Sequence, residues 1–353
     1  MIAFISATLL SLIIAPIIID WYQRHGWVEK PEDQKHIKRT HLRPVPRGGG
    51  VIIFLAILTG SLLLLKVDQA LIGILGGALL LAIAGFFDVL YDIHPAWRLG
   101  AGLAAALLVV FSGVGIGYIT NPFGPGVIHL DSWQLSYTLF GQERSIWVIA
   151  DIFAILFIIW NMNIVNWAKG VDGQLPGFVS VAALIIGFLS YRFIDDPTQF
   201  NTAHLSFIVS GAYAGYLFWN WYPQRTMPGY GAGSLAGYFL AVLAILSGAK
   251  VATTLMVLAI PTADAIFTIM RRLRAGKSPI WGDRGHLHHK LLDVLGWGRR
   301  RIALFYWFSS AGLGLLSLYL NTLGKIFVLL CVFAFVFGFL IWAKWQSSRQ
   351  LAK

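Results

Sequence analysis

Eleven apolar runs constrain the fold of this chain more than any other feature. They lie near residues 2–19, 51–66, 70–87, 99–119, 146–164, 177–194, 204–222, 235–248, 251–270, 302–321 and 325–344. The hydrocarbon core of a bilayer is about 30 Å thick, so a helix that spans it needs roughly 20 mainly apolar residues. The run at 235–248 is short for that purpose. The pattern therefore predicts an all-α polytopic membrane protein with 10–11 transmembrane helices.

Composition excludes a soluble fold. Hydrophobic residues make up 57% of the 353 residues and charged residues only 12%, whereas soluble domains carry roughly 25% charged residues. The first apolar run has no Lys or Arg before it and no small-residue cleavage pattern after it, so we expect a retained helix. The single cysteine, Cys331, excludes an internal disulfide framework and a cysteine-based zinc site. We expect residues 1–353 to form one integral membrane domain.

The basic residues predict the orientation. One side of the membrane would hold segments 20–50, 88–98, 165–176, 223–234, 271–301 and the C-terminal tail. That side collects 22 of the 27 Lys and Arg residues, so it is predicted to be cytoplasmic. Topology thus explains the net charge of +11, and we expect no nucleic acid partner. On the opposite side, segment 120–145 alternates apolar and polar residues around turn residues, which predicts a short external β-hairpin.

The dense polar motifs all fall in the predicted cytoplasmic segments. They are DQKHIKRTHLRPVPRGGG (33–50), GFFDVLYDIHPAWRL (85–99), NIVNWAKGVDG (163–173), GAGSLAG (231–237) and PTADAIFTIMRRLRAGKSPIWGDRGHLHHKLL (261–292). The last motif mixes Arg and Lys with three histidines, whose cationic groups match phosphate oxygens in charge and geometry. Contact with anionic lipids is an alternative for the Arg and Lys residues. A zinc site is an alternative for the histidines, although no acidic or Cys partner has a usual zinc spacing.

Taken together, these motifs resemble the polyprenyl-phosphate N-acetylhexosamine-1-phosphate transferase family, and the resemblance covers nearly the whole chain. It implies a helix bundle in the cell membrane with an active site facing the cytoplasm. There a sugar-1-phosphate would pass from a UDP-sugar to polyprenyl phosphate, with release of UMP. The histidine loop resembles that of the GlcNAc-transferring members, which implies UDP-GlcNAc as the donor. In bacteria the acceptor would be undecaprenyl phosphate, and the reaction would begin envelope polysaccharide synthesis. The resemblance also implies Mg²⁺, with Mn²⁺ as the alternative, and allows a homodimer.

The same resemblance implies roles for individual residues. Asp88 matches the first Asp of a family Asp-Asp pair, and Asp172 matches the second Asp of Asp-Gly-x-Asp-Gly. A helix cap for Asp88 and a turn for Asp172 are the structural alternatives. The implied catalytic residues are Asp88, Asp172 and His286, and the implied metal ligands are Asn166 and Asp172. The implied substrate-binding residues are Lys38, Arg47, Asp92, Arg98, Asn166, Lys169, Asp283, Arg284, His288 and His289.

Three positions depart from the family pattern, because Val89, Lys169 and Gly231 stand where carboxylates are expected. Two hypotheses follow. The chain is an active transferase, in which the donor diphosphate holds most of the metal, Lys169 supplies fixed positive charge and Asp92 acts as a second carboxylate. Alternatively, it is a non-catalytic relative that binds polyprenyl phosphate or nucleotide, or that scaffolds partner enzymes. A transporter is disfavoured because the chain has no inverted repeat.

Overall fold

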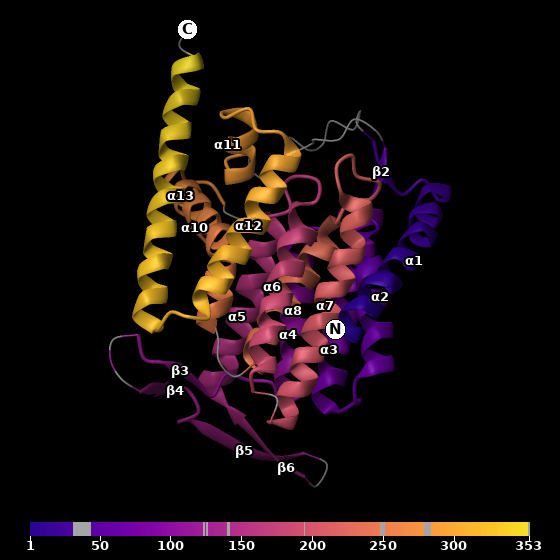
Figure 1. Cartoon of the computed structure of the whole chain (residues 1–353). Coiled ribbons are helices and arrows are strands. Elements are labelled where there is room, and N and C mark those ends of the chain that lie inside the picture. The colour runs from indigo at the N-terminus through magenta and orange to yellow at the C-terminus, as the bar shows by residue number, and fades with distance from the viewer. Residues whose placement is uncertain are drawn as a thin grey trace.

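The computed structural model describes residues 1–30, 44–122, 124, 126–139, 142–193, 195–247, 251–278 and 284–351. Helices that run side by side make up most of it (Figure 1). Their bounds are α1 Ile2–Arg24, α2 Gly49–Leu64, α3 Gln69–Tyr91, α4 Pro95–Phe111, α5 Val148–Trp167, α6 Gln174–Tyr191, α7 Pro197–Asn220, α8 Gly229–Leu246, α9 Val251–Val257, α10 Ala259–Arg274, α11 Leu287–Asp293, α12 Arg299–Ser317 and α13 Thr322–Leu351. Each of the eleven predicted runs overlaps helix, although the run at 99–119 continues beyond the end of α4 at Phe111. This confirms an all-α membrane protein.

The number of spans depends on how strictly a span is defined. Within the described ranges, six helices are long and apolar enough to cross a membrane, namely α1, α3, α5, α6, α8 and α13. The run at 251–270 is not the single straight span that the sequence predicted. It breaks between α9 and α10, whose axes differ by 81°, and this bent pair would be a seventh span. The other apolar helices are shorter or more polar, such as the 16-residue α2 and the 17-residue α4.

Two hairpins confirm and extend the predicted β-structure near 120–145. Strand β3 (Tyr118–Thr120) pairs antiparallel with β4 (Val127–His129), and β5 (Gln134–Leu139) pairs with β6 (Gln142–Trp147). Figure 1 shows both hairpins at the end of the bundle opposite α11 and the C-terminus.

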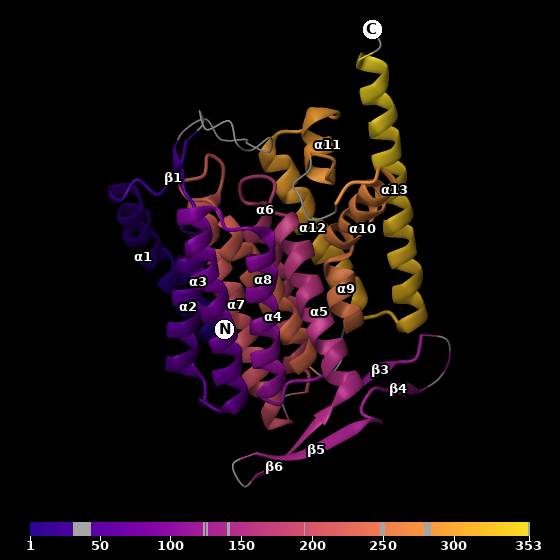
Figure 2. The same cartoon turned by 180° about the vertical axis from the view of Figure 1, so that it is seen from behind.

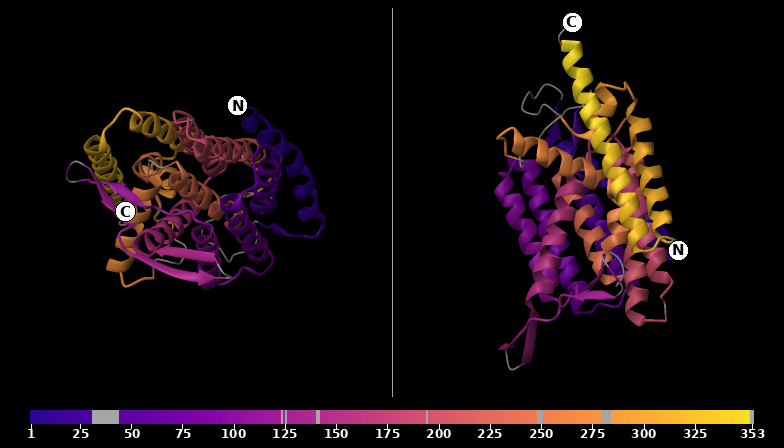
Figure 3. Two further views of the ribbon diagram at one scale, coloured as in Figure 1. Left: turned by 90° about the horizontal axis from the view of Figure 1, so that it is seen from below. Right: turned by 90° about the vertical axis from the view of Figure 1, so that its left-hand side faces the viewer.

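A third strand pair, which the sequence did not predict, lies at the other end of the bundle. Strand β1 (Val28–Glu29) pairs with β2 (Val45–Pro46). We call this end, which also carries α11 and the loop between α5 and α6, the site end (Figure 2). Helix α13 stands at the edge of the bundle and reaches beyond the other helices at the site end (Figure 3).

Helix α8 is the most buried of the six candidate spans, with 83% of its apolar window inside the protein. Small residues allow its neighbours to approach it closely, as in other membrane helix pairs. A Cβ added to Gly85 of α3 would lie 2.5 Å from the Cα of Gly231 in α8, and one added to Gly50 of α2 would lie 2.9 Å from the same atom. Helices α2, α3 and α8 therefore cross in backbone contact close to the site end.

Candidate functional site

The loop between α5 and α6, residues 168–173, lies at the centre of the predicted site. Its last residue, Gly173, has a φ of +76°, a left-handed conformation that favours glycine. The backbone N–H of Gly173 donates to the Oδ1 of Asn220 over 3.0 Å, and that of Val171 donates to the Oε1 of Gln174 over 3.2 Å. These bonds hold the loop in one conformation. Three of its residues, Lys169, Gly170 and Asp172, each lie next to a different polar group of the site.

The first group joins the end of α3 to the start of α4. The Nη2 of Arg98 lies 2.6 Å from the Oδ1 of Asp88 and 2.9 Å from the Oδ1 of Asp92. Asp88 is only 4% exposed. Asp92 directly follows α3 in a left-handed conformation (φ 47°), and the shared guanidinium of Arg98 holds its carboxylate near that of Asp88. The hydroxyl of Tyr230 donates to the backbone oxygen of Arg98 over 2.7 Å and so connects α8 to this group.

Lys169 lies beside this group. Its Nζ donates to the Oδ1 of Asn166 over 2.7 Å and to the backbone oxygen of Gly229 over 2.5 Å. Asn166 in turn packs against Gly233, where an added Cβ would lie 2.3 Å from its Oδ1. The amide oxygen that was predicted to bind a metal therefore accepts a hydrogen bond from an ammonium group.

Three cations act electrostatically on the Asp88 carboxylate, namely Arg98, Lys169 and Arg47. Arg47 follows β2 and forms an ion pair with Glu29 of β1. Glu29 is itself buried, so the strand pair fixes the position of the arginine. The site end thus surrounds one buried carboxylate with positive charge from three separate segments.

The histidines form the second group. All three are buried, with exposed fractions of 5% for His286 and 2% for His288 and His289. The rings of His286 and His288 are nearly parallel, with centroids 5.7 Å apart, and those of His288 and His289 are 4.3 Å apart. The ring of His288 lies against Gly170, where an added Cβ would be 1.8 Å from its Cδ2. Only glycine at that position lets the histidines approach the α5–α6 loop.

Asp264 of α10 positions the histidine segment. Its Oδ2 lies 3.0 Å from the Nδ1 of His286, and its Oδ1 accepts the backbone N–H of Leu287 over 2.8 Å. With Nδ1 held by the carboxylate, the imidazole presents its Nε2 to other partners. Sequence reasoning did not place Asp264 in the site, although the Pro-Thr-Ala-Asp motif that contains it opens the histidine segment.

Asp172 belongs to the third group. It is 3% exposed, its Oδ2 accepts the backbone N–H of Gln224 over 3.3 Å, and the Nη1 of Arg299 lies 4.0 Å away. The guanidinium of Arg299 also lies over the ring of Tyr222, 5.1 Å from its centroid. The side chain of Asp172 therefore bonds to the segment between α7 and α8. Gln224 and Arg299 were not predicted, because neither stands in one of the recognised motifs.

The remaining predicted residues lie at the edge of these groups or outside the described structure. The Nη2 of Arg284 lies 3.1 Å from the Oδ1 of Asp293, so Arg284 contacts the end of α11. Val89 packs against the hydrophobic core. Lys38 and Asp283 lie outside the described residues. The roles predicted for Arg284, Lys38 and Asp283 stay predictions.

The residues predicted to hold magnesium do not fit that ion as they are placed. Mg²⁺ requires a nearly octahedral set of oxygen ligands at about 2.0–2.1 Å. The Oδ1 of Asn166 faces the Lys169 ammonium, and the Oδ2 of Asp172 faces Gln224 and Arg299. Across the ranges that the structure describes, no group of three His, Cys, Asp or Glu side chains is arranged to hold a metal ion.

An apolar groove of about 440 Å³ borders the site. Its lining comes from α4, α5 and α10, and comprises Leu99, Leu156, Ile159, Trp160, Asn163, Ile164, Trp167 and Ile269. Leu99 directly follows Arg98, and the ring of Trp167 lies 6.3 Å from that of His286. The groove therefore reaches the first two polar groups.

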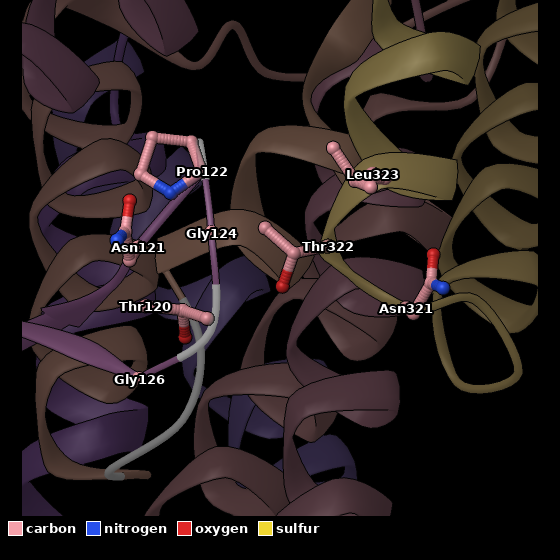
Figure 4. Close-up of a pocket in the computed structure, with 8 residues that line it drawn as sticks. All are labelled: Thr120, Asn121, Pro122, Gly124, Gly126, Asn321, Thr322 and Leu323. Atoms are coloured by element: carbon pink, nitrogen blue, oxygen red, sulfur yellow. The ribbon is translucent and has the colours of Figure 1, made fainter.

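Another cavity, of about 280 Å³, lies at the opposite end of the bundle. It is lined by Thr120, Asn121, Pro122, Gly124, Gly126, Asn321, Thr322 and Leu323 (Figure 4). These residues belong to the β3–β4 hairpin, to the start of α13 and to the residue before it, at the end of the bundle opposite the described site residues.

Comparison with known proteins matches residues 71–248 to the model of glycosyl transferase family 4. That range, about half of the chain, contains Asp88, Arg98, Asn166 and Asp172, whereas the histidine segment follows it. The chain is 26% identical to a "Probable undecaprenyl-phosphate N-acetylglucosaminyl 1-phosphate transferase" of Bacillus subtilis (strain 168), over 82% of this chain and 76% of the relative.

Two further relatives have similar identity. A "Decaprenyl-phosphate N-acetylglucosaminephosphotransferase" of Mycolicibacterium smegmatis is 26% identical, over 83% of this chain and 76% of the relative. A "Phospho-N-acetylmuramoyl-pentapeptide-transferase" of Mycobacterium sp. (strain JLS) is 27% identical, over 89% of this chain and 95% of the relative. The matched range, the helical membrane architecture and these relatives together confirm the resemblance seen in the motifs, and the chain belongs to glycosyl transferase family 4.

Proposed function

We propose that this protein transfers a sugar-1-phosphate, GlcNAc-1-phosphate, from a UDP-sugar to polyprenyl phosphate and releases UMP. One observation carries the proposal. A buried carboxylate paired with Arg98, the Lys169 ammonium and three buried histidines converge on the α5–α6 loop, beside an apolar groove. The printed names of the Bacillus and Mycolicibacterium relatives support GlcNAc as the sugar and polyprenyl phosphate as the acceptor. The reaction would be the first membrane step of cell-envelope polysaccharide synthesis.

The chemistry brings two anionic phosphorylated substrates together. An oxygen of the lipid phosphate attacks the β-phosphorus of the UDP-sugar, and the bond from that phosphorus to the bridging oxygen breaks, so UMP leaves. Fixed cations at such a site offset the charge that gathers in the transition state. In this proposal Asp88 orients the lipid phosphate through Arg98, and the histidines bind the diphosphate. Holding both reactants in line contributes a further large part of the acceleration.

The apolar groove suits the hydrocarbon of the acceptor lipid. Its lining along α5 runs from Leu156 to Trp167, a length of about 16 Å at the helical rise of 1.5 Å per residue. A lipid chain in this groove would place its phosphate beside Arg98 and the histidines. We propose that the site end faces the cytoplasm, because 22 of the 27 Lys and Arg residues belong to segments assigned to that side.

An assay of the purified protein in nanodiscs tests the proposal. It supplies radiolabelled UDP-GlcNAc and undecaprenyl phosphate and measures lipid-linked product and UMP. We expect turnover by the wild type, and a loss of about 10²-fold in Asp88→Asn, the scale of a misplaced reactant. The matched control is Asp195→Asn, which makes the same change at an exposed position at the opposite end of the bundle.

The absence of product with every UDP-sugar tried would contradict the proposal. Ligand binding without turnover would then support the alternative, a non-catalytic family member that binds polyprenyl phosphate or nucleotide, or that scaffolds partner enzymes. If Asp88→Asn turned over at the wild-type rate, the buried carboxylate would have no essential part in the transfer reaction.

A further inference from the structure

Lys169 places a positive charge inside the transfer site. Its side chain is half-buried, and two oxygens from different helices hold its Nζ, the Oδ1 of Asn166 in α5 and the backbone oxygen of Gly229 in α8. Two hydrogen bonds to well-packed groups fix the ammonium far more tightly than a surface lysine, whose long side chain samples many rotamers. The charge is therefore preorganised before substrate arrives.

Among the described residues, the groups around Lys169 include no cluster of three His, Cys, Asp or Glu side chains that could hold a divalent metal. The amide oxygen of Asn166 accepts from the ammonium. A side chain at position 231 is disfavoured by packing, because even a Cβ on Gly231 would lie 3.2 Å from the Cα of Gly50 and 3.3 Å from the Cα of Gly85, so α2 and α3 would have to give way by a few tenths of an ångström. A longer side chain at Gly231 would push α2 and α3 away from α8. Lys169 and the closely packed glycines at positions 50, 85 and 231 therefore occur together where α2, α3, α5 and α8 meet.

We propose that Lys169 is the resident cation of the transfer reaction, and that its ammonium does the electrostatic work for which the described residues form no metal site. This inference rests on the proposed function and deepens it. The ammonium binds the diphosphate of the nucleotide sugar and stabilises the charge on the bridging oxygen as the bond to the β-phosphorus breaks. The lipid phosphate oxygen forms the new bond to that phosphorus, the bridging oxygen leaves on UMP, and Lys169 keeps its protons throughout.

Binding measurements test the inference without any need for turnover. Electron paramagnetic resonance of Mn²⁺ added to the nanodisc protein, without nucleotide, should show no specifically bound ion in the wild type. In EDTA, isothermal titration should still show binding of UDP-GlcNAc, and Lys169→Met should weaken that binding at least tenfold. The matched control, Lys66→Met, removes an exposed lysine at the opposite end of the bundle and should leave binding unchanged.

Turnover measurements then examine the catalytic part. We expect the wild-type rate in EDTA to stay within about twofold of the rate in Mg²⁺. We expect Lys169→Met to lower it about 10²- to 10³-fold, as the loss of one preorganised donor does elsewhere. Lys169→Arg keeps the charge and should retain at least tenfold more turnover than Lys169→Met. Thermal unfolding of each variant shows whether the protein remains folded.

Two results would overturn the inference. One is a stoichiometric Mn²⁺ site in the wild type that Asn166→Ala or Asp172→Asn removes, and the other is wild-type turnover that EDTA abolishes. If no variant and no UDP-sugar gives product, the proposed function fails. The Mn²⁺ and UDP-GlcNAc binding results then still decide whether Lys169 replaces a metal.

Discussion

Replacing Gly85 by alanine tests the backbone contact that holds α2, α3 and α8 together at the site end. The added Cβ would lie 2.5 Å from the Cα of Gly231, whereas ordinary contact begins at 3.4 Å. One of the two helices must therefore move by roughly 1 Å in a densely packed interior. Because the neighbouring atom is backbone, no side chain can rotate out of the way.

The matched control lies on the same helix. A Cβ on Gly76 would meet only the Cδ1 of Leu108, at 3.7 Å, which is ordinary contact. Both Gly→Ala changes gain similar helix propensity, so the difference between the two variants isolates the packing strain. Forcing extra volume into a packed core costs about 1–3 kcal/mol. We expect Gly85→Ala to be less stable than Gly76→Ala by that amount.

Reversible unfolding in mixed micelles with increasing SDS measures this difference in the free energy of unfolding. Sugar-phosphate transfer should fall as well, because Asp88 lies one turn after Gly85 and Tyr230 directly precedes Gly231. A shift between α3 and α8 would therefore disturb the contacts that both residues make with Arg98. Equal stability of Gly85→Ala and Gly76→Ala would refute the close crossing and, with it, the packing reason for the glycine at position 231.

Two further changes examine the histidine group and the groove. Asp264→Asn keeps an acceptor for the N–H of Leu287 but removes the charge beside His286, so turnover should fall about 10- to 100-fold, the scale of a lost hydrogen bond to a charged group. Unchanged turnover in a steady-state assay would show that the carboxylate has no part in positioning the imidazole. Trp160→Ala should raise the KM for polyprenyl phosphate and leave the KM for UDP-GlcNAc unchanged, because the ring lines the apolar groove. The control is Leu62→Ala, an exposed residue of α2 outside the groove, and an equal effect of both changes on the acceptor KM would argue against the groove.

The sequence predicted the elements of this fold well, because helix formation in a membrane depends on local apolar length. It did not predict the bend between α9 and α10. The run that contains them holds Pro261 and Asp264, but the direction in which the chain turns is set by packing. The alternation of apolar and polar residues predicted a hairpin near 120–145. The same kind of pattern did not reveal β1 and β2, which are two residues each. A pattern of period two cannot be recognised in so short a strand.

The amino-acid sequence by itself determined the membrane-spanning character, the family and the identity of Asp88, Asp172 and His286 as candidate site residues, because composition and motifs can be read along one stretch of chain. Only the tertiary structure decided how these residues meet. The bond from Tyr230 to Arg98 joins residues 132 positions apart, and that from Lys169 to Gly229 joins residues 60 apart. Such contacts depend on which helices pack together, so the placement of the ammonium of Lys169 on the backbone oxygen of Gly229 is a property of the folded bundle.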